Sequence, residues 1–296
     1  MRPPIRALPL VALAAAMLTL GGCSSAPEPA PTPNTSTHAT RDLRYATAAG
    51  EDLLLNACLP RSDVRTPAVV LVHGGGFEAG NKEGMMPLCR KIAADGFAAF
   101  SIDYRLMPEH QYPAQVDDLR AAIEWLREPA QVKRFEIDPE KIGVFGSSAG
   151  AIIAASQGTS GTGDTGEGSR VAAVVALSPA SDLTESGLAL GKPSDDEVRL
   201  ILAYLGCRDV GDCPDAKAAS PLFGVDPTDP PFYIAVGDSE IVPEQQAEVL
   251  SDALKNANVP VTYEVKPGSR HALALLDDAM LANVLAFLHE NLDAPE

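Results

Sequence analysis

The chain has 296 residues, of which 46% are hydrophobic, and its 40 acidic and 23 basic side chains give a formal net charge of −17. This length is sufficient for one large α/β domain with a substantial core. So acidic a surface repels nucleic acids and anionic lipid headgroups, and we expect neither as a partner.

The first 22 residues have the composition of an export signal. Arg2 and Arg6 precede an apolar run over residues 8–20, which is too short and wrongly flanked for a stable transmembrane helix. The run ends in Leu20-Gly21-Gly22-Cys23, which resembles the bacterial lipobox, whose cysteine becomes the lipidated first residue of the mature chain. We therefore expect an exported cell-envelope lipoprotein, anchored in the membrane through Cys23 and facing the periplasm or the cell surface. The alternative is an ordinary signal peptide with an incidental Cys23.

Residues 23–41 are predicted to be a disordered tether. They are rich in Ser, Ala, Pro and Thr and have almost no large apolar side chain, so they cannot bury enough surface to become ordered. We expect the folded domain to span residues 42–296.

Four cysteines remain when Cys23 is set aside. An even number permits disulfides in an exported protein. Cys207 and Cys213 are close together in a polar loop and are the favoured pair. Cys58 and Cys89 either pair or remain as small buried side chains.

Strands and helices alternate along the rest of the chain. Short runs of residues that favour β-structure predict strands at residues 44–47, 53–58, 67–72, 97–102, 142–145, 171–177, 232–236 and 261–265. Helices are expected at residues 85–95, 113–127, 149–155, 196–205, 243–258 and 277–291. This alternation predicts the α/β class, with a mostly parallel central sheet covered by helices on both faces. The irregular segment 184–219 lies between two predicted core strands and is a candidate lid.

A G-x-S-x-G pattern, Gly146-Ser147-Ser148-Ala149-Gly150, separates a predicted strand from a predicted helix. Strand, tight turn and helix in this order are the context in which such a pattern exposes a nucleophilic serine. The N-terminus of the helix favours the negative charge that develops on a bound carbonyl oxygen. We therefore expect Ser148 to be a nucleophile, and the alternative is a turn of small residues without chemistry.

A second glycine-rich stretch, His73-Gly74-Gly75-Gly76, directly follows another predicted strand. Glycines let backbone N–H groups approach a ligand closely. Together with the N–H of Ala149, these groups could hold the oxyanion of a tetrahedral intermediate. We expect His73 itself to brace this loop.

A serine nucleophile needs a base, and the chain has five histidines. Four are set aside by their positions: His38 in the tether, His73 in the glycine loop, His110 in a turn before the serine, and His289 in the last helix. His271 remains, in a loop between a strand and the last helix, at the carboxyl-end edge of the sheet where Ser148 is also expected. The alternative is a surface histidine without a role.

The acid that orients the base should follow a strand between Ser148 and His271. Asp238 and Glu240 both follow the predicted strand at residues 232–236. The residues alone do not separate them. No cluster of Cys and His has the spacing of metal ligands, so we expect no metal and no cofactor.

Several stretches carry a resemblance to a known group of enzymes. They are His73-Gly-Gly-Gly-Phe77; Asp103-Tyr-Arg-Leu-Met-Pro-Glu-His110 with Tyr112-Pro113-Ala114 and Asp117; Gly146-Ser-Ser-Ala-Gly150; Ser220-Pro221 with Pro230-Pro231; and Gly237-Asp-Ser-Glu240. Over residues 44–290 the chain resembles the esterases of the hormone-sensitive-lipase type, an α/β-hydrolase group.

The resemblance assigns roles that the residues alone leave open. It implies Glu240 as the catalytic acid, with Asp238 as the alternative, and Gly75 and Gly76 as the loop donors of the oxyanion hole. It also implies that Asp103, Arg105, Glu109 and His110 are structural. Many members carry a helical cap before the first strand, and its expected absence here predicts a more open acyl pocket, roofed at most by 184–219.

The expected function is that of a serine carboxylic-ester hydrolase, acting on small-molecule short-chain esters through an acyl-enzyme intermediate. One alternative keeps the machinery and changes the substrate, as in a carbohydrate (acetyl or feruloyl) esterase or an amidase. A less favoured alternative is a surface lipoprotein that binds without turnover.

Overall fold

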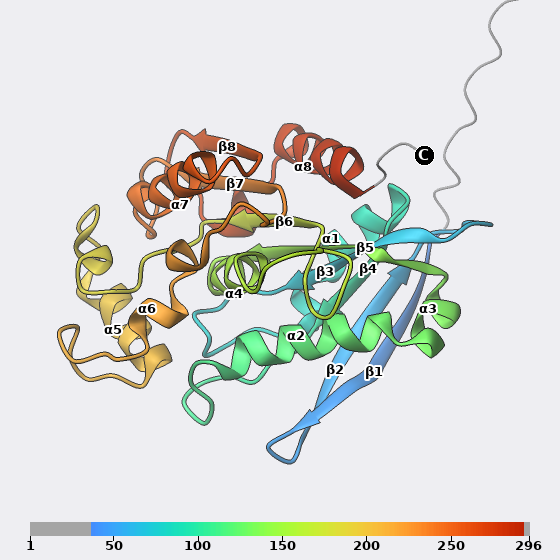
Figure 1. The fold of residues 1–296 in the computed structure, drawn as a ribbon, viewed down its shortest axis with the longest axis horizontal. Helices are drawn as coiled ribbons and strands as arrows, with labels where there is room; N and C mark the ends of the chain where they lie inside the picture. The colour runs from blue at the N-terminus through green and yellow to red at the C-terminus, as the bar shows by residue number, and fades with distance from the viewer. Residues whose placement is uncertain (1–36, 293–296) are drawn as a thin grey trace, which may run out of the picture. The chain divides into compact units, whose positions relative to one another are not determined.

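An eight-stranded β-sheet forms the centre of the computed structural model, which describes residues 37–292 (Figure 1). Its strands are β1 (His38–Ala48), β2 (Glu51–Leu59), β3 (Thr66–Val72), β4 (Ala98–Ile102), β5 (Ile137–Ser147), β6 (Ala173–Leu177), β7 (Phe232–Gly237) and β8 (Val261–Lys266). They lie in the order β1-β2-β4-β3-β5-β6-β7-β8. The β1–β2 and β2–β4 pairs are antiparallel, and all other neighbours are parallel. The α/β class with a mostly parallel sheet is confirmed.

Side chains of the central strands alternate between two hydrophobic cores, because successive residues of a strand point to opposite faces. In β3, Ala68, Val70 and Val72 belong to one core, whereas Val69 and Leu71 belong to the other. All five are fully buried. A strand covered on both faces therefore appears in the sequence as a continuous apolar run.

Helices cover both faces of the sheet (Figure 1). They are α1 (Met86–Ala94), α2 (Ala114–Arg127), α3 (Pro129–Phe135), α4 (Ala149–Gly158), α5 (Asp195–Leu205), α6 (Ala216–Ala219), α7 (Glu244–Asn256) and α8 (Asp278–Leu292), with short 3-10 turns η1 (Lys82–Met85), η2 (Gly187–Ala189), η3 (Pro221–Gly224) and η4 (Ala272–Leu275). Helices α2, α3, α4 and α7 pack into one core, and α1 and α8 into the other. No helix within residues 37–292 combines the length and the apolar character needed to cross a bilayer.

All predicted strands and helices are present, but some boundaries were predicted wrongly and two short helices were not predicted. Strand β1 begins at His38, so residues 38–41 belong to the fold and not to the predicted tether, and the domain begins before residue 42. Their polar side chains hid a strand that is stabilised by pairing with β2, where His38 lies opposite Leu59. Helices α3 and α6 were not predicted, because their seven and four residues are too few to show a helical period. The predictions for the export signal and Cys23 lie outside the described residues.

Two disulfides are present. The favoured pair, Cys207 and Cys213, is bonded in the loop after α5, with its Cα atoms 5.4 Å apart. The second bond resolves the open alternative, because it joins Cys58 of β2 to Cys89 of α1 with Cα atoms 5.8 Å apart.

Candidate active site

Ser148 occupies the sharp turn between β5 and α4, with φ 54° and ψ −123°. A non-glycine residue rarely adopts a positive φ, and such backbone strain persists only where the surroundings enforce it. Here the N–H of Ser148 donates to the carbonyl of Leu177 at 2.8 Å, and its carbonyl accepts from Ala151 N–H at 2.7 Å. Strand β6 and helix α4 thus hold the serine from both sides.

The glycines on either side of this turn are required by backbone contacts. A Cβ at Gly146 would lie 2.0 Å from the carbonyl oxygen of Gly150. A Cβ at Gly150 would lie 2.3 Å from the carbonyl oxygen of Val72 and 2.5 Å from that of His73. The turn therefore closes on itself and against the end of β3, and only glycine fits at either position.

The loop after β3 brings backbone N–H groups to the same place. Gly75 and Gly76 have φ values of 117° and 63°, which favour glycine. Within residues 37–292, the N–H groups of Gly75, Gly76 and Ala149 have no hydrogen-bond acceptor. Gly76 and Ala149 line a cavity at Ser148, and Gly75 lines a second cavity at the same serine. These donors are free to bind an oxygen that carries negative charge.

His73 braces this loop, as the sequence predicted. Its ring stacks on Tyr104, with the centroids 4.2 Å apart, and its Nδ1–H donates to Gly74 O at 2.7 Å. The hydroxyl of Tyr104 donates to the His73 carbonyl at 2.9 Å. Burial lowers the pKa of His73, and the hydrogen bond to the Gly74 carbonyl and the charge of Asp103 oppose this only in part.

His271 meets Ser148 although 123 residues separate them in the chain, and its Nε2 lies 2.8 Å from Ser148 Oγ. The Nδ1–H of His271 donates to Glu240 Oε2. The carboxylate of Glu240 has no exposed side-chain surface, and its Oε1 accepts from Gly237 N–H and from the Ser178 hydroxyl, both at 2.7 Å. Serine, imidazole and carboxylate thus form one continuous hydrogen-bonded chain.

Asp238, the alternative acid, makes different contacts. Its Oδ1 accepts from Gly268 N–H at 2.9 Å and from the Ser239 hydroxyl at 2.8 Å. These two bonds lower the pKa of Asp238, the Gly268 bond more strongly. Asp238 therefore joins the loop after β7 to the loop before His271, and of the two candidates only Glu240 contacts the imidazole.

Ser148 lies between two cavities of different size. The smaller, about 80 Å³, has mostly apolar walls that include Phe77, Ile152, Leu188, Leu200 and Ile201. The larger, about 570 Å³, is lined by the glycine loop and by His271. Within residues 37–292, no group of three or more His, Cys, Asp or Glu side chains is arranged to hold a metal ion.

Residues of the segment 184–219 form part of the smaller cavity's wall. Leu188, Pro193, Glu197, Leu200 and Ile201 all line this cavity. It is therefore this segment that narrows the space on one side of Ser148.

Gln246 of α7 holds the chain at the start of the segment 184–219 through four hydrogen bonds. Its buried Oε1 accepts from the N–H groups of Ser181 and Asp182 at 2.8 and 2.9 Å. Its Nε2 donates to the carbonyls of Asp182 and Gly187 at 3.1 and 2.8 Å. No feature of the sequence predicts this role, because a glutamine on an amphipathic helix is normally solvated.

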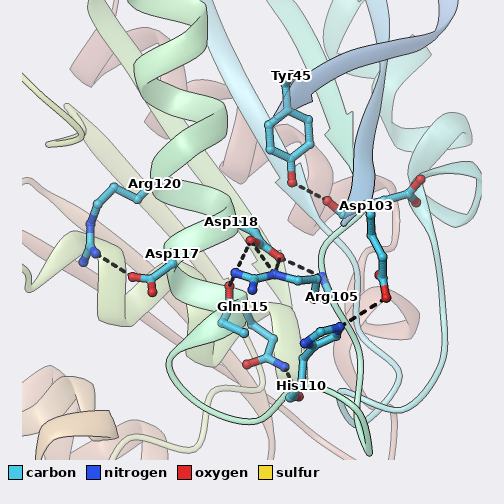
Figure 2. A network of polar contacts seen from close by, with 10 residues as sticks. Tyr45, Asp103, Arg105, His110, Gln115, Asp117, Asp118 and Arg120 are labelled. Carbon is cyan, nitrogen blue, oxygen red and sulfur yellow. Dashed lines mark hydrogen bonds and ion pairs between the residues drawn. The ribbon is translucent and has the colours of Figure 1, made fainter. Parts of the chain in front are cut away.

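A polar network holds the segment that follows β4 (Figure 2). Arg105 reaches Asp118 of α2 through Nη2 at 2.6 Å, and the backbone N–H of Arg105 donates to the same carboxylate at 2.8 Å. The Tyr45 hydroxyl donates to the Asp103 carbonyl at 2.6 Å. His110 Nε2 lies 3.2 Å from a carboxylate oxygen of Glu51. Asp103, Arg105 and His110 thus have the structural positions that the resemblance implied.

Comparison with known proteins defines the class of this chain. In solved structures it is similar to an esterase, Est2 of Thermogutta terrifontis, with a TM-score of 0.69 and 26% identity over 85% of this chain and 92% of that chain. It is also similar to a truncated carbohydrate esterase from gut microbiota, with a TM-score of 0.75 and 25% identity over 89% of this chain and 99% of that chain. The fold and these similarities define an α/β-hydrolase.

The family follows from the sequence comparison. The BD-FAE family model matches residues 55–254, and the chain belongs to this family. Among curated relatives, Esterase LipQ of Mycobacterium tuberculosis is 31% identical over 80% of this chain and 58% of its own length. Esterase LipC of the same organism is 30% identical over 74% of this chain and 57% of its own length. The chain therefore spans somewhat over half the length of these two relatives.

The two acids of the loop after β7 provide a matched test of the geometry. We expect Glu240→Gln to lower kcat for ester hydrolysis by about 10³-fold or more, because an amide cannot stabilise the imidazolium that forms on His271. Asp238→Asn should stay within about threefold of the parent, because Asp238 does not contact the imidazole. Steady-state kinetics on both folded variants checks this, and an inverted order would contradict the assignment.

Because the His73 imidazole is buried, we expect the free energy of unfolding to depend on pH. Its pKa is lowered from 6.5, so as the pH falls below about 6.5 the unfolded chain binds a proton that the folded chain resists. The stabilisation of the fold by the neutral His73 imidazole is present above about pH 6.5 and is lost as the pH falls through the folded-state pKa of His73. The difference in Tm between the parent and His73→Asn should therefore narrow between pH 7.5 and 5.5, as thermal unfolding would show. A constant difference would contradict the prediction.

Proposed function

We propose that this chain is a serine carboxylic-ester hydrolase that acts through an acyl-enzyme intermediate. Ser148 Oγ attacks the ester carbonyl while His271 Nε2 accepts its proton, and Glu240 orients the imidazole and stabilises its charge. The observation that carries this proposal is the 2.8 Å contact between Ser148 Oγ and His271 Nε2. The similarity to esterases supports it.

The oxyanion that forms on the carbonyl would accept hydrogen bonds from the N–H groups of Gly75, Gly76 and Ala149. Their lack of other acceptors within residues 37–292 supports this assignment. Loss of one such donor typically costs about 3 kcal/mol of transition-state stabilisation.

The positions of the cavities suggest where the two halves of an ester bind. His271 must return its proton to the leaving alcohol, so the alcohol belongs in the larger cavity that His271 lines. The acyl group then occupies the smaller apolar cavity of about 80 Å³. So small a space favours short acyl chains, and water subsequently attacks the acyl-enzyme from the side of the departed alcohol.

Nitrophenyl esters of increasing acyl length test this proposal. We expect hydrolysis of acetate and butyrate esters with a burst of nitrophenol, and kcat/KM lower by roughly tenfold or more for an octanoate ester. Ser148→Ala should lower kcat by at least about 10³-fold. A fully active Ser148→Ala variant would end the proposal, and equal rates at all acyl lengths would remove the assignment of the acyl cavity.

A carbohydrate ester is the second candidate, with the same machinery and a sugar as the alcohol. Two observations favour it: the larger cavity has room for a bulky alcohol, and a carbohydrate esterase is among the similar structures. Parallel assays on acetylated and feruloylated oligosaccharides, nitrophenyl esters and a nitroanilide amide separate these readings. A kcat/KM for a sugar ester well above that for nitrophenyl acetate would favour the carbohydrate esterase.

We further propose that the protein is exported and anchored to the membrane by lipid on Cys23. The Leu20-Gly21-Gly22-Cys23 stretch supports this, and the two disulfides fit an oxidising compartment. The parent should partition into the detergent phase of a cell extract with a lipid mass on Cys23, and Cys23→Ser should remain in the aqueous phase. Aqueous partitioning of the parent would refute the anchor.

A further inference from the structure

We infer that Ser178 is a positioning residue of this site, because its hydroxyl joins the segment that carries Glu240 to the segment that carries His271. This inference rests on the proposed ester hydrolysis. It adds a fourth side chain, from the end of β6, to the three that the sequence pointed to.

Ser178 is fixed in place by its backbone. It directly follows β6, it is fully buried, and its N–H donates to the carbonyl of Ala235 in β7 at 2.8 Å. Its φ of 58° lies in the left-handed region, which a serine occupies only when its surroundings hold it there. The hydroxyl is therefore presented at one defined point, between the ends of β6 and β7.

The Ser178 hydroxyl makes two hydrogen bonds whose directions are determined by the partners. The Glu240 carboxylate can only accept, so the hydroxyl proton goes to its Oε1, at 2.7 Å. The N–H of Ala272 can only donate, so it bonds a lone pair of the hydroxyl oxygen, at 2.8 Å. One hydroxyl thus connects the acid to the residue that directly follows the base.

Both ends of this connection matter for the geometry of His271. Ala272 has a φ of 53°, so the backbone beside His271 is also in the left-handed region, and its N–H bond to Ser178 helps to hold it there. At the other end, within the described residues 37–292, Glu240 Oε1 accepts from the backbone N–H of Gly237 and from the side-chain hydroxyl of Ser178. Without the hydroxyl, both segments lose a fixed contact, and a displacement of about 1 Å in such a site can cost about 10²-fold in rate.

Two substitutions of Ser178 distinguish the effect of losing the hydroxyl from the effect of the strained backbone. Ser178→Ala removes the hydroxyl and keeps the unfavourable φ, whereas Ser178→Gly removes the hydroxyl at a φ that glycine readily adopts. With an acetate ester, we expect both variants to lower kcat by roughly 10- to 100-fold and to leave KM within about twofold. Ser178 also lines the smaller cavity proposed for the acyl group. The short acetate ester is therefore used, so that contact between a long acyl chain and residue 178 does not affect the comparison.

The matched control is Ser251→Ala. Ser251 of α7 is also fully buried, but its hydroxyl has no hydrogen-bond partner within the described part of the chain. Its removal should leave kcat and KM at the parental values. Near-UV circular dichroism and Tm establish whether each variant is folded. If Ser178→Ala does not fold, Ser178→Gly alone provides the kinetic test.

A spectroscopic readout distinguishes positioning from a general loss of structure. The downfield proton resonance of the His271 Nδ1–H bond to Glu240 should shift or broaden in both Ser178 variants and remain unchanged in Ser251→Ala. Parental kcat in a folded Ser178 variant, or lower kcat with an unchanged resonance, overturns the inference. A parent protein that hydrolyses no ester overturns the proposed function instead, so the two failures are distinguishable.

Discussion

The close contact between the turn at Ser148 and the end of β3 is the constraint on which the site depends. A serine at φ 54° would relax if its neighbours allowed it, but the backbone of Gly150 lies directly against the carbonyls of Val72 and His73. This contact fixes the serine relative to the glycine loop that follows β3. The proposed nucleophile and the proposed oxyanion donors are therefore positioned by one packed backbone junction and depend little on side-chain rotamers.

The parallel sheet brings the other groups to the same edge, because the carboxyl ends of parallel strands meet there. Ser148 follows β5, Ser178 follows β6, Glu240 follows β7 and His271 follows β8. These four strands are direct neighbours in the sheet. Four groups from distant parts of the sequence thus reach bonding distance with only short loops, and residues of the segment 184–219 line the smaller of the two cavities at the serine.

Site features that depend on local sequence could be predicted from the sequence, whereas those that depend on contacts between distant residues could not. Ser148 and the glycine loop were predictable because steric limits impose glycine at specific positions, and His271 remained after the other histidines were set aside. Glu240 and Asp238 both follow β7, so only the conformation of their loop decides between them. Ser178 and Gln246 could not be predicted, because each acts through hydrogen bonds to residues distant in the sequence. His38 was misassigned because pairing with β2 stabilises a strand of polar composition.

We propose that Ser148 is the nucleophile that forms the covalent intermediate. The most direct measurement is mass spectrometry of the protein after treatment with a nitrophenyl phosphonate, with the modified site mapped by peptide fragmentation. If Ser148 is the nucleophile, one adduct per chain forms on Ser148, in step with the loss of esterase activity. An unmodified Ser148 in an inactivated protein, or full activity after complete modification of Ser148, would contradict it.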